Sequence, residues 1–130
     1  WPHVHAATDV TGFGLAGHAH EMAQQSGCSL KLEWAALPWM DGSAQYAEAQ
    51  YFSGGTVRNA EYYGQSVVFD IGLSEWQRML IFDPQTSGGM LLAVAPECAD
   101  DFLLELSKCG GAGYIVGTAM AGVAGSIIVS

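Results

Sequence analysis

Glycine clusters divide this 130-residue chain into short segments, and this pattern limits the possible folds more than any other feature. Glycine accounts for 17 of the 130 residues, nearly twice the roughly 7% of an average protein. Such clusters are typical of tight turns and of places where the backbone closely approaches another group. They fall at Gly12-Phe13-Gly14, Gly54-Gly55, Gly88-Gly89 and Gly110-Gly111.

Hydrophobic periodicity between the clusters predicts short helices and strands that interleave. Helical patterns cover residues 14–25, 41–52, 75–82 and 97–108, with a shorter one ending at 63. Strand patterns cover 4–7, 29–34, 67–70, 89–95, 114–120 and 126–129, the last two as a hairpin. Because the βαβ rhythm of a dinucleotide-binding fold is missing, we expect an α+β fold, a small mixed or antiparallel sheet with helices packed on it.

Three local predictions accompany these elements. Asp41 or Ser43 is the predicted N-cap of the helix over 41–52, and Ser74 with Gln77 matches a capping box for the helix over 75–82. In the last helix, one face is expected to point inward, namely Phe102, Leu103 and Leu106.

Charge and cysteine content exclude several functions. Thirteen acidic against four basic residues give a net charge of −9, which argues against nucleic-acid binding. An anionic substrate would need a metal ion or backbone amides. No apolar run approaches the roughly 20 residues of a membrane span. Three cysteines without a CxxC motif fit a reducing, cytoplasmic environment.

The chain begins with Trp1 and shows no features of a signal peptide. We expect residues 1–130 to form a single domain taken from a longer protein.

The first polar, glycine-rich segment runs from Thr8 to Leu15 and places Asp9 just before a predicted helix. Asp9 or Thr11 could simply cap that helix. The sharper interpretation makes Asp9 a magnesium ligand, because Mg²⁺ takes one or two carboxylates together with substrate phosphates. The free N–H groups of the helix would then help to hold phosphate.

Two further segments have a similar character. Asp83-Pro84-Gln85-Thr86-Ser87-Gly88-Gly89 is either a structural turn or a ligand loop that precedes a buried strand. Ser53-Gly54-Gly55-Thr56-Val57-Arg58-Asn59 contains one of only four basic residues, so Arg58 could contact an anion, remain solvated or form a salt bridge. The histidines, in pairs at 3/5 and 18/20, are expected on a polar surface or at a domain contact and not on a metal.

Taken together, these three segments resemble the carboxy-terminal domain of selenophosphate synthetase (selenide, water dikinase). Their order and spacing agree with that family over nearly the whole chain. Gly17-His18 belongs to the resemblance, and the markers that are specific in combination are Thr-Asp-Val-Thr-Gly-Phe-Gly at 8–14 and Asp-Pro-Gln-Thr-Ser-Gly-Gly at 83–89. The third segment departs slightly, since Ser53 stands where proline is common.

The resemblance implies an enzyme that makes selenophosphate from selenide, ATP and water and releases AMP and phosphate. It implies Mg²⁺, a homodimer, and an α+β domain like that of the aminoimidazole ribonucleotide synthetase superfamily. The family's magnesium-binding aspartate falls on Asp9. Other residues are assigned only a place near the interdomain cleft: Thr11, Arg58, Asn59, Asp83, Gln85, Thr86 and Ser87.

The resemblance also implies that the reactive cysteine or selenocysteine, its lysine partner and the nucleotide loop belong to an amino-terminal, ATP-binding half. Cys28, Cys98 and Cys109 do not match the reactive position, so this chain alone is predicted to be inactive. Two alternatives remain: a domain of another ATP-dependent member of the superfamily, and a non-catalytic interaction domain.

Overall fold

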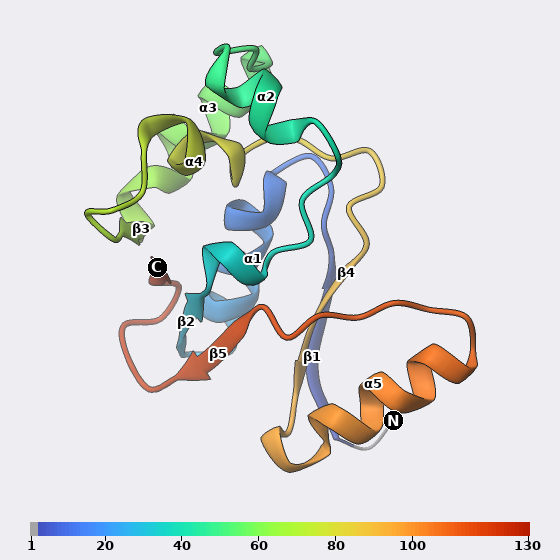
Figure 1. Cartoon of the computed structure of the whole chain (residues 1–130). Helices are drawn as coiled ribbons and strands as arrows, with labels where there is room; N and C mark the ends of the chain where they lie inside the picture. The colour runs from blue at the N-terminus through green and yellow to red at the C-terminus, as the bar shows by residue number, and fades with distance from the viewer. Residues whose placement is uncertain (1–2) are drawn as a thin grey trace.

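The computed structural model describes residues 3–130, so Trp1 lies outside the described residues. Two strands far apart in sequence form an antiparallel ribbon through its middle (Figure 1). β1 (Val4–Asp9) pairs with β4 (Met90–Val94), with Asp9 opposite Met90. β1 therefore continues two residues beyond the predicted end at Ala7, and Asp9 is the last residue of a strand.

Four short strands form a second, mixed sheet in the order β3-β6-β2-β5. Their bounds are β2 (Ser29–Leu32), β3 (Val67–Phe69), β5 (Gly117–Met120) and β6 (Ile127–Val129). β2 is antiparallel to β5 and parallel to β6, and β6 is parallel to β3. The predicted hairpin is wrong. Ile127 and Val129 are fully buried, so β6 takes a central place between β2 and β3 instead of an edge beside β5.

Helix α1 (Gly14–Gln25) packs closely on this sheet. Its inward face carries small residues, Ala16, Ala19 and Ala23, all essentially without exposed surface. Small side chains let the helix axis approach the strands, where the larger Leu30, Leu32 and Ile127 complete the core. The predicted α+β class is confirmed.

Helices α2 (Ser43–Glu48), α3 (Gly54–Tyr63) and α4 (Glu75–Leu80) gather at one end of the molecule (Figure 1). The predicted helix over 41–52 is shorter than expected, because Gly42 before it and Gln50 after it have positive φ angles. Gly42, not Asp41 or Ser43, is the N-cap residue. The capping box of α4 is confirmed, since Gln77 Oε1 accepts a hydrogen bond of 2.9 Å from the Ser74 N–H.

Helix α5 (Ala99–Lys108) lies to one side, near the far end of the ribbon (Figure 1). None of its residues is fully buried, and the residues predicted to point inward, Phe102, Leu103 and Leu106, are only half-buried. On its apolar face, Leu103 and Leu106 lie against Gly113 in the chain that follows. A periodic pattern identified the helix but not the depth at which it is buried.

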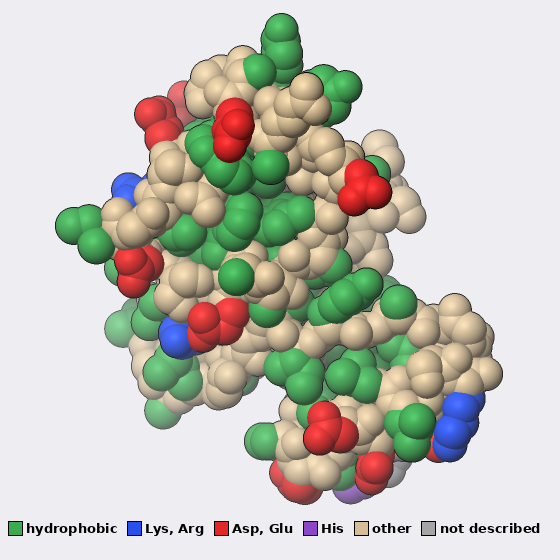
Figure 2. All heavy atoms as spheres, in the orientation of Figure 1, with side chains coloured by type: hydrophobic (Ala, Val, Ile, Leu, Met, Phe, Trp, Pro, Cys, Tyr) green, Lys and Arg blue, Asp and Glu red, His purple; other side chains and the backbone are tan. Residues whose placement is uncertain are grey.

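The surface is dominated by acidic and neutral side chains. On the face shown in Figure 2, carboxylates are spread over several elements and basic side chains are few. No helix within residues 3–130 is both long and apolar enough to cross a membrane. All three cysteines are free thiols.

Candidate functional site

The first and second glycine-rich segments lie against each other where β1 ends and β4 begins. Val10 and the Gly88-Gly89 turn exchange two backbone hydrogen bonds, Val10 N–H to Gly89 O at 2.9 Å and Gly88 N–H to Val10 O at 3.0 Å. The Gln85 N–H donates to Thr11 O at 3.0 Å. The chain after Asp9 is therefore fixed to the loop that begins at Asp83.

Two glycines in these segments are required by close backbone contacts. A Cβ atom on Gly88 would lie 2.6 Å from the carbonyl oxygen of Val10. Gly14 has a φ of +68°, and a Cβ there would lie 2.6 Å from the carbonyl carbon of Phe82. Neither position can accept a larger residue without backbone movement, because such distances are well inside van der Waals contact.

The third segment is bonded to both of the others through α3. The buried Asn59 amide donates to Gly12 O and to Phe82 O, each at 2.9 Å. The Thr56 hydroxyl donates to Asp83 Oδ1 at 2.5 Å. Gln85 Nε2 donates to the other carboxylate oxygen of Asp83 at 3.2 Å. Asn59 and Asp83 thus connect the three loops, and their polar groups are largely occupied within the protein.

Thr56 was not singled out from the sequence, yet it is fully buried and satisfies the Asp83 carboxylate. Replacing Thr56 by valine keeps the side-chain shape but leaves one carboxylate oxygen without its donor. We expect a loss of about 2 kcal/mol in the free energy of unfolding, measured by urea denaturation. Thr86→Val is the matched control and should stay within about 0.5 kcal/mol, because Thr86 is exposed. Equal effects in the two variants would contradict this role for Thr56.

Asp9 differs from Asp83 in having a free carboxylate. It is exposed, and within residues 3–130 its side chain has no hydrogen bond or ion pair. No side chain caps α1, so neither Asp9 nor Thr11 acts as the N-cap considered from the sequence. A free carboxylate is the kind of oxygen ligand that Mg²⁺ binds in combination with phosphate and water, so the donor chemistry fits.

The remaining residues predicted for the site lie on its surface. Thr86 and Ser87 are exposed between Gln85 and Gly88. Arg58 is exposed, and the described residues provide no carboxylate within ion-pair distance of it. It lies at a shallow hollow of about 390 Å³, with these other lining residues: Phe13, Glu21, Asn59, Tyr62 and Tyr63.

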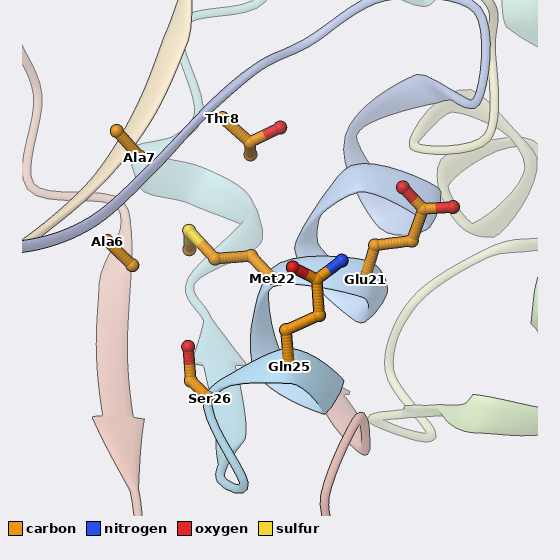
Figure 3. Close-up of a pocket in the computed structure, with 7 residues that line it drawn as sticks. All are labelled: Ala6, Ala7, Thr8, Glu21, Met22, Gln25 and Ser26. Carbon is orange, nitrogen blue, oxygen red and sulfur yellow. The ribbon is translucent and has the colours of Figure 1, made fainter.

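Tyr63 in this hollow is a hydrogen-bond donor at neutral pH. Burial raises its pKa to about 12, helped by the neighbouring Glu21 carboxylate. Its hydroxyl donates to Glu21 Oε1 at 3.2 Å. A second hollow, of about 220 Å³, lies between β1 and α1 and also includes Glu21 (Figure 3). Its walls carry no basic side chain: Ala6, Ala7, Thr8, Glu21, Met22, Gln25 and Ser26.

The prediction that the histidines lie on a polar surface is wrong for His18. It is buried, and its Nε2 lies 3.1 Å from Thr11 Oγ1 and 3.4 Å from the Phe13 nitrogen. His20 is half-buried and bonded through Nδ1 to Gly125 O at 2.8 Å. The signal that could have identified His18 is its position one turn after Gly14 and one turn before the half-buried Met22. No group of three or more metal-binding side chains occurs in the described part of the chain.

The amides at the start of α1 are mostly bonded within the protein. Gly14 N–H donates to Thr11 O at 3.1 Å, and Ala16 N–H donates to Ile81 O at 3.0 Å. These two groups are therefore not free for a phosphate, contrary to the expectation for this helix terminus. Asp9, Thr11, Thr86 and Ser87 form the accessible part of the site.

The fold and the three converging loops define an α+β domain with a free carboxylate, that of Asp9, at its loop cluster. The sequence pattern of the family described as "AIR synthase related protein, C-terminal domain" matches residues 2–130. The chain belongs to this family.

Curated relatives confirm the resemblance inferred from the motifs. The selenide, water dikinase of Rhizobium meliloti strain 1021 is 47% identical over 133 residues, which cover 99% of this chain and 37% of that protein. The protein of the same name from Pseudomonas aeruginosa is 46% identical over 107 residues, covering 82% of this chain and 30% of that protein. The chain spans about a third of the length of the curated relatives it matches.

Solved structures share the fold at lower identity. Escherichia coli HypE, a hydrogenase maturation protein, matches with a TM-score of 0.65 and 21% identity, covering 98% of this chain and 32% of that one. Thiamine-monophosphate kinase of Stenotrophomonas maltophilia K279a matches with a TM-score of 0.63 and 16% identity, covering 99% of this chain and 32% of that one. A structure of HypE in complex with ATP matches with a TM-score of 0.60 and 17% identity, covering 97% of this chain and 32% of that one.

Proposed function

We propose that this chain is the carboxy-terminal domain of a selenophosphate synthetase, which makes selenophosphate from selenide, ATP and water and releases AMP and phosphate. The observation that carries the proposal is the free carboxylate of Asp9 at the convergence of three loops. The names of relatives 40% to 47% identical support the substrate assignment. The activity belongs to the full-length protein, a cytoplasmic homodimer in which an amino-terminal domain binds ATP and meets this one.

Asp9 is the residue that would hold Mg²⁺. A bound magnesium ion neutralises charge on transferring phosphoryl groups. One carboxylate supplies only part of the coordination shell, so the amino-terminal domain and the nucleotide phosphates must provide the rest. The acidic surface of this domain suits a role in holding the metal ion.

The residues around Asp9 divide into two roles. Asn59, Thr56 and Asp83 hold the loops in place through hydrogen bonds inside the domain. Thr86, Ser87 and Arg58 are exposed and free to contact the nucleotide or the amino-terminal domain. Positioning and charge neutralisation dominate phosphoryl transfer, so a rigid loop cluster contributes by fixing where the carboxylate lies.

The reaction can be tested on the full-length protein by measuring AMP release with and without selenide. We expect AMP and phosphate to form only when selenide and Mg²⁺ are both present. ATP turnover that does not depend on selenide but requires another substrate would favour a different member of the superfamily. For the isolated chain we expect no turnover and no Mg-ATP binding tighter than millimolar by calorimetry. Micromolar binding would show that the chain has a nucleotide site of its own.

A further inference from the structure

His18 lies beneath the loop that leads from Asp9 into α1. Its ring is buried and packs on the Phe13 ring at a centroid distance of 5.3 Å and an interplanar angle of 30°. Its Nε2 atom lies 3.1 Å from Thr11 Oγ1 and 3.4 Å from the Phe13 nitrogen. One ring nitrogen therefore contacts two groups of the loop.

These contacts determine which ring nitrogen carries the proton. A backbone N–H can only donate, so the Phe13 contact requires Nε2 to be an acceptor. A neutral imidazole has one bare nitrogen, which places the proton of His18 on Nδ1. The Thr11 hydroxyl must then also donate to Nε2, and the two donors share its lone pair.

The direction of this hydrogen bond decides what Thr11 can bind. The Thr11 carbonyl already accepts from Gly14 and Gln85, so the hydroxyl is the oxygen of this residue that a ligand can still contact. With its proton directed to His18, the half-buried hydroxyl oxygen presents only lone pairs. Because phosphate oxygens also offer only lone pairs, they cannot form a hydrogen bond with this hydroxyl. A metal ion or its bound water finds a suitable acceptor.

We propose that His18 is a positioning residue that makes Thr11 an acceptor on the metal side of the site. This inference rests on the proposed function, in which Asp9, two residues earlier, binds Mg²⁺. The Thr11 hydroxyl and Asp9 then contact the same hydrated cation, and this hydroxyl makes no contact with ATP phosphate. His18 acts through Thr11 and does not touch the substrate.

Thr11→Val in the full-length protein tests whether the Thr11 hydroxyl acts on the metal ion or on the ATP phosphates. We expect the half-saturating Mg²⁺ concentration to rise about tenfold, because one hydrogen bond to a charged group is lost. The KM for ATP at saturating Mg²⁺ should stay unchanged. Thr11→Ser, which retains the hydroxyl, should restore the Mg²⁺ dependence. A higher KM for ATP with an unchanged Mg²⁺ requirement would overturn the inference.

Two variants of His18 separate its hydrogen bond from its packing. His18→Phe keeps the ring contact with Phe13 but removes the acceptor, and we expect the half-saturating Mg²⁺ concentration to rise about fivefold. His18→Gln offers an amide oxygen near the position of Nε2 and should restore most of the loss. A normal Mg²⁺ requirement in His18→Phe together with a raised one in His18→Gln would mean that His18 acts through packing alone, which contradicts the proposal.

Nitrogen NMR of the full-length protein labelled with ¹⁵N-histidine provides a readout that needs no turnover. The His18 signals, identified by their loss in His18→Gln, should show a protonated Nδ1 and a bare Nε2. A proton on Nε2 would overturn the inference whether or not Asp9 binds metal. Conversely, an unchanged Mg²⁺ requirement in Asp9→Asn would contradict the proposed function and leave the ring assignment standing. The two failures are therefore distinguishable.

Discussion

Replacing Asp9 by asparagine in the full-length protein is expected to lower Mg²⁺-dependent ATP turnover by about 100-fold or more. The substitution keeps the size of the side chain and removes the charge that attracts the cation. Loss of a single group that stabilises developing charge commonly costs 10²- to 10³-fold in kcat. Initial rates of AMP release, measured across a range of Mg²⁺ concentrations, would show whether added metal restores part of the activity.

The same substitution should leave the fold unchanged. Asp9 is exposed and its side chain has no partner in the described residues, so the free energy of unfolding should change by less than about 0.5 kcal/mol. Asp41→Asn is the matched control, since Asp41 is an exposed carboxylate in the loop before α2. It should retain full turnover. Full activity in Asp9→Asn would remove Asp9 from the site.

Gly14→Ala is expected to give the largest loss of stability, about 3 kcal/mol. An L-residue at a φ of +68° costs about 1–2 kcal/mol. The added methyl group would also meet the Phe82 carbonyl, with 2.6 Å to its carbon and 2.7 Å to its oxygen. Overpacking of this kind adds about 1–3 kcal/mol. The total is a large share of the roughly 5–15 kcal/mol that stabilises a typical domain.

Gly12→Ala is the control for this substitution because it lies in the same motif. A Cβ atom on Gly12 would have no neighbour within 4 Å, and its φ is not in the left-handed region. We expect its free energy of unfolding to change by no more than about 0.5 kcal/mol, measured by tryptophan fluorescence during urea denaturation. If the two alanine variants unfold at the same urea concentration, the packing of α1 against Phe82 is not what requires glycine at position 14.

Local patterns in the sequence were sufficient to predict most elements but not their neighbours. The strand over 67–70 and the capping box at Ser74 depend on adjacent residues, and both are present. The pairing of β6 depends on which strand has room beside it for Ile127 and Val129. Because β2 and β3 lie far from β6 in the chain, the local sequence is equally compatible with a hairpin of residues 114–120 and 126–129.

The candidate site was likewise only partly predictable from local sequence. Motif composition identified Asp9, Thr11, Asp83 and Asn59 as candidates without separating ligand groups from structural ones. The separation requires hydrogen-bond partners, and these come from other segments: the Asn59 amide bonds to Gly12 and Phe82, whereas the Asp9 carboxylate has no partner among the described residues. His18 and Thr56 were missed because their importance lies in those partners.

The sequence by itself determined the α+β class, the three loop segments and the acidic residue on which the proposed function depends. These features follow from side-chain chemistry and short-range periodicity, which need no knowledge of the rest of the chain. Only the tertiary structure decided that the loops meet, that Asp83 is occupied while Asp9 is free, and that His18 lies under the loop. Such properties arise from packing between distant segments, where burial and hydrogen-bond partners are shared among elements that no local pattern connects.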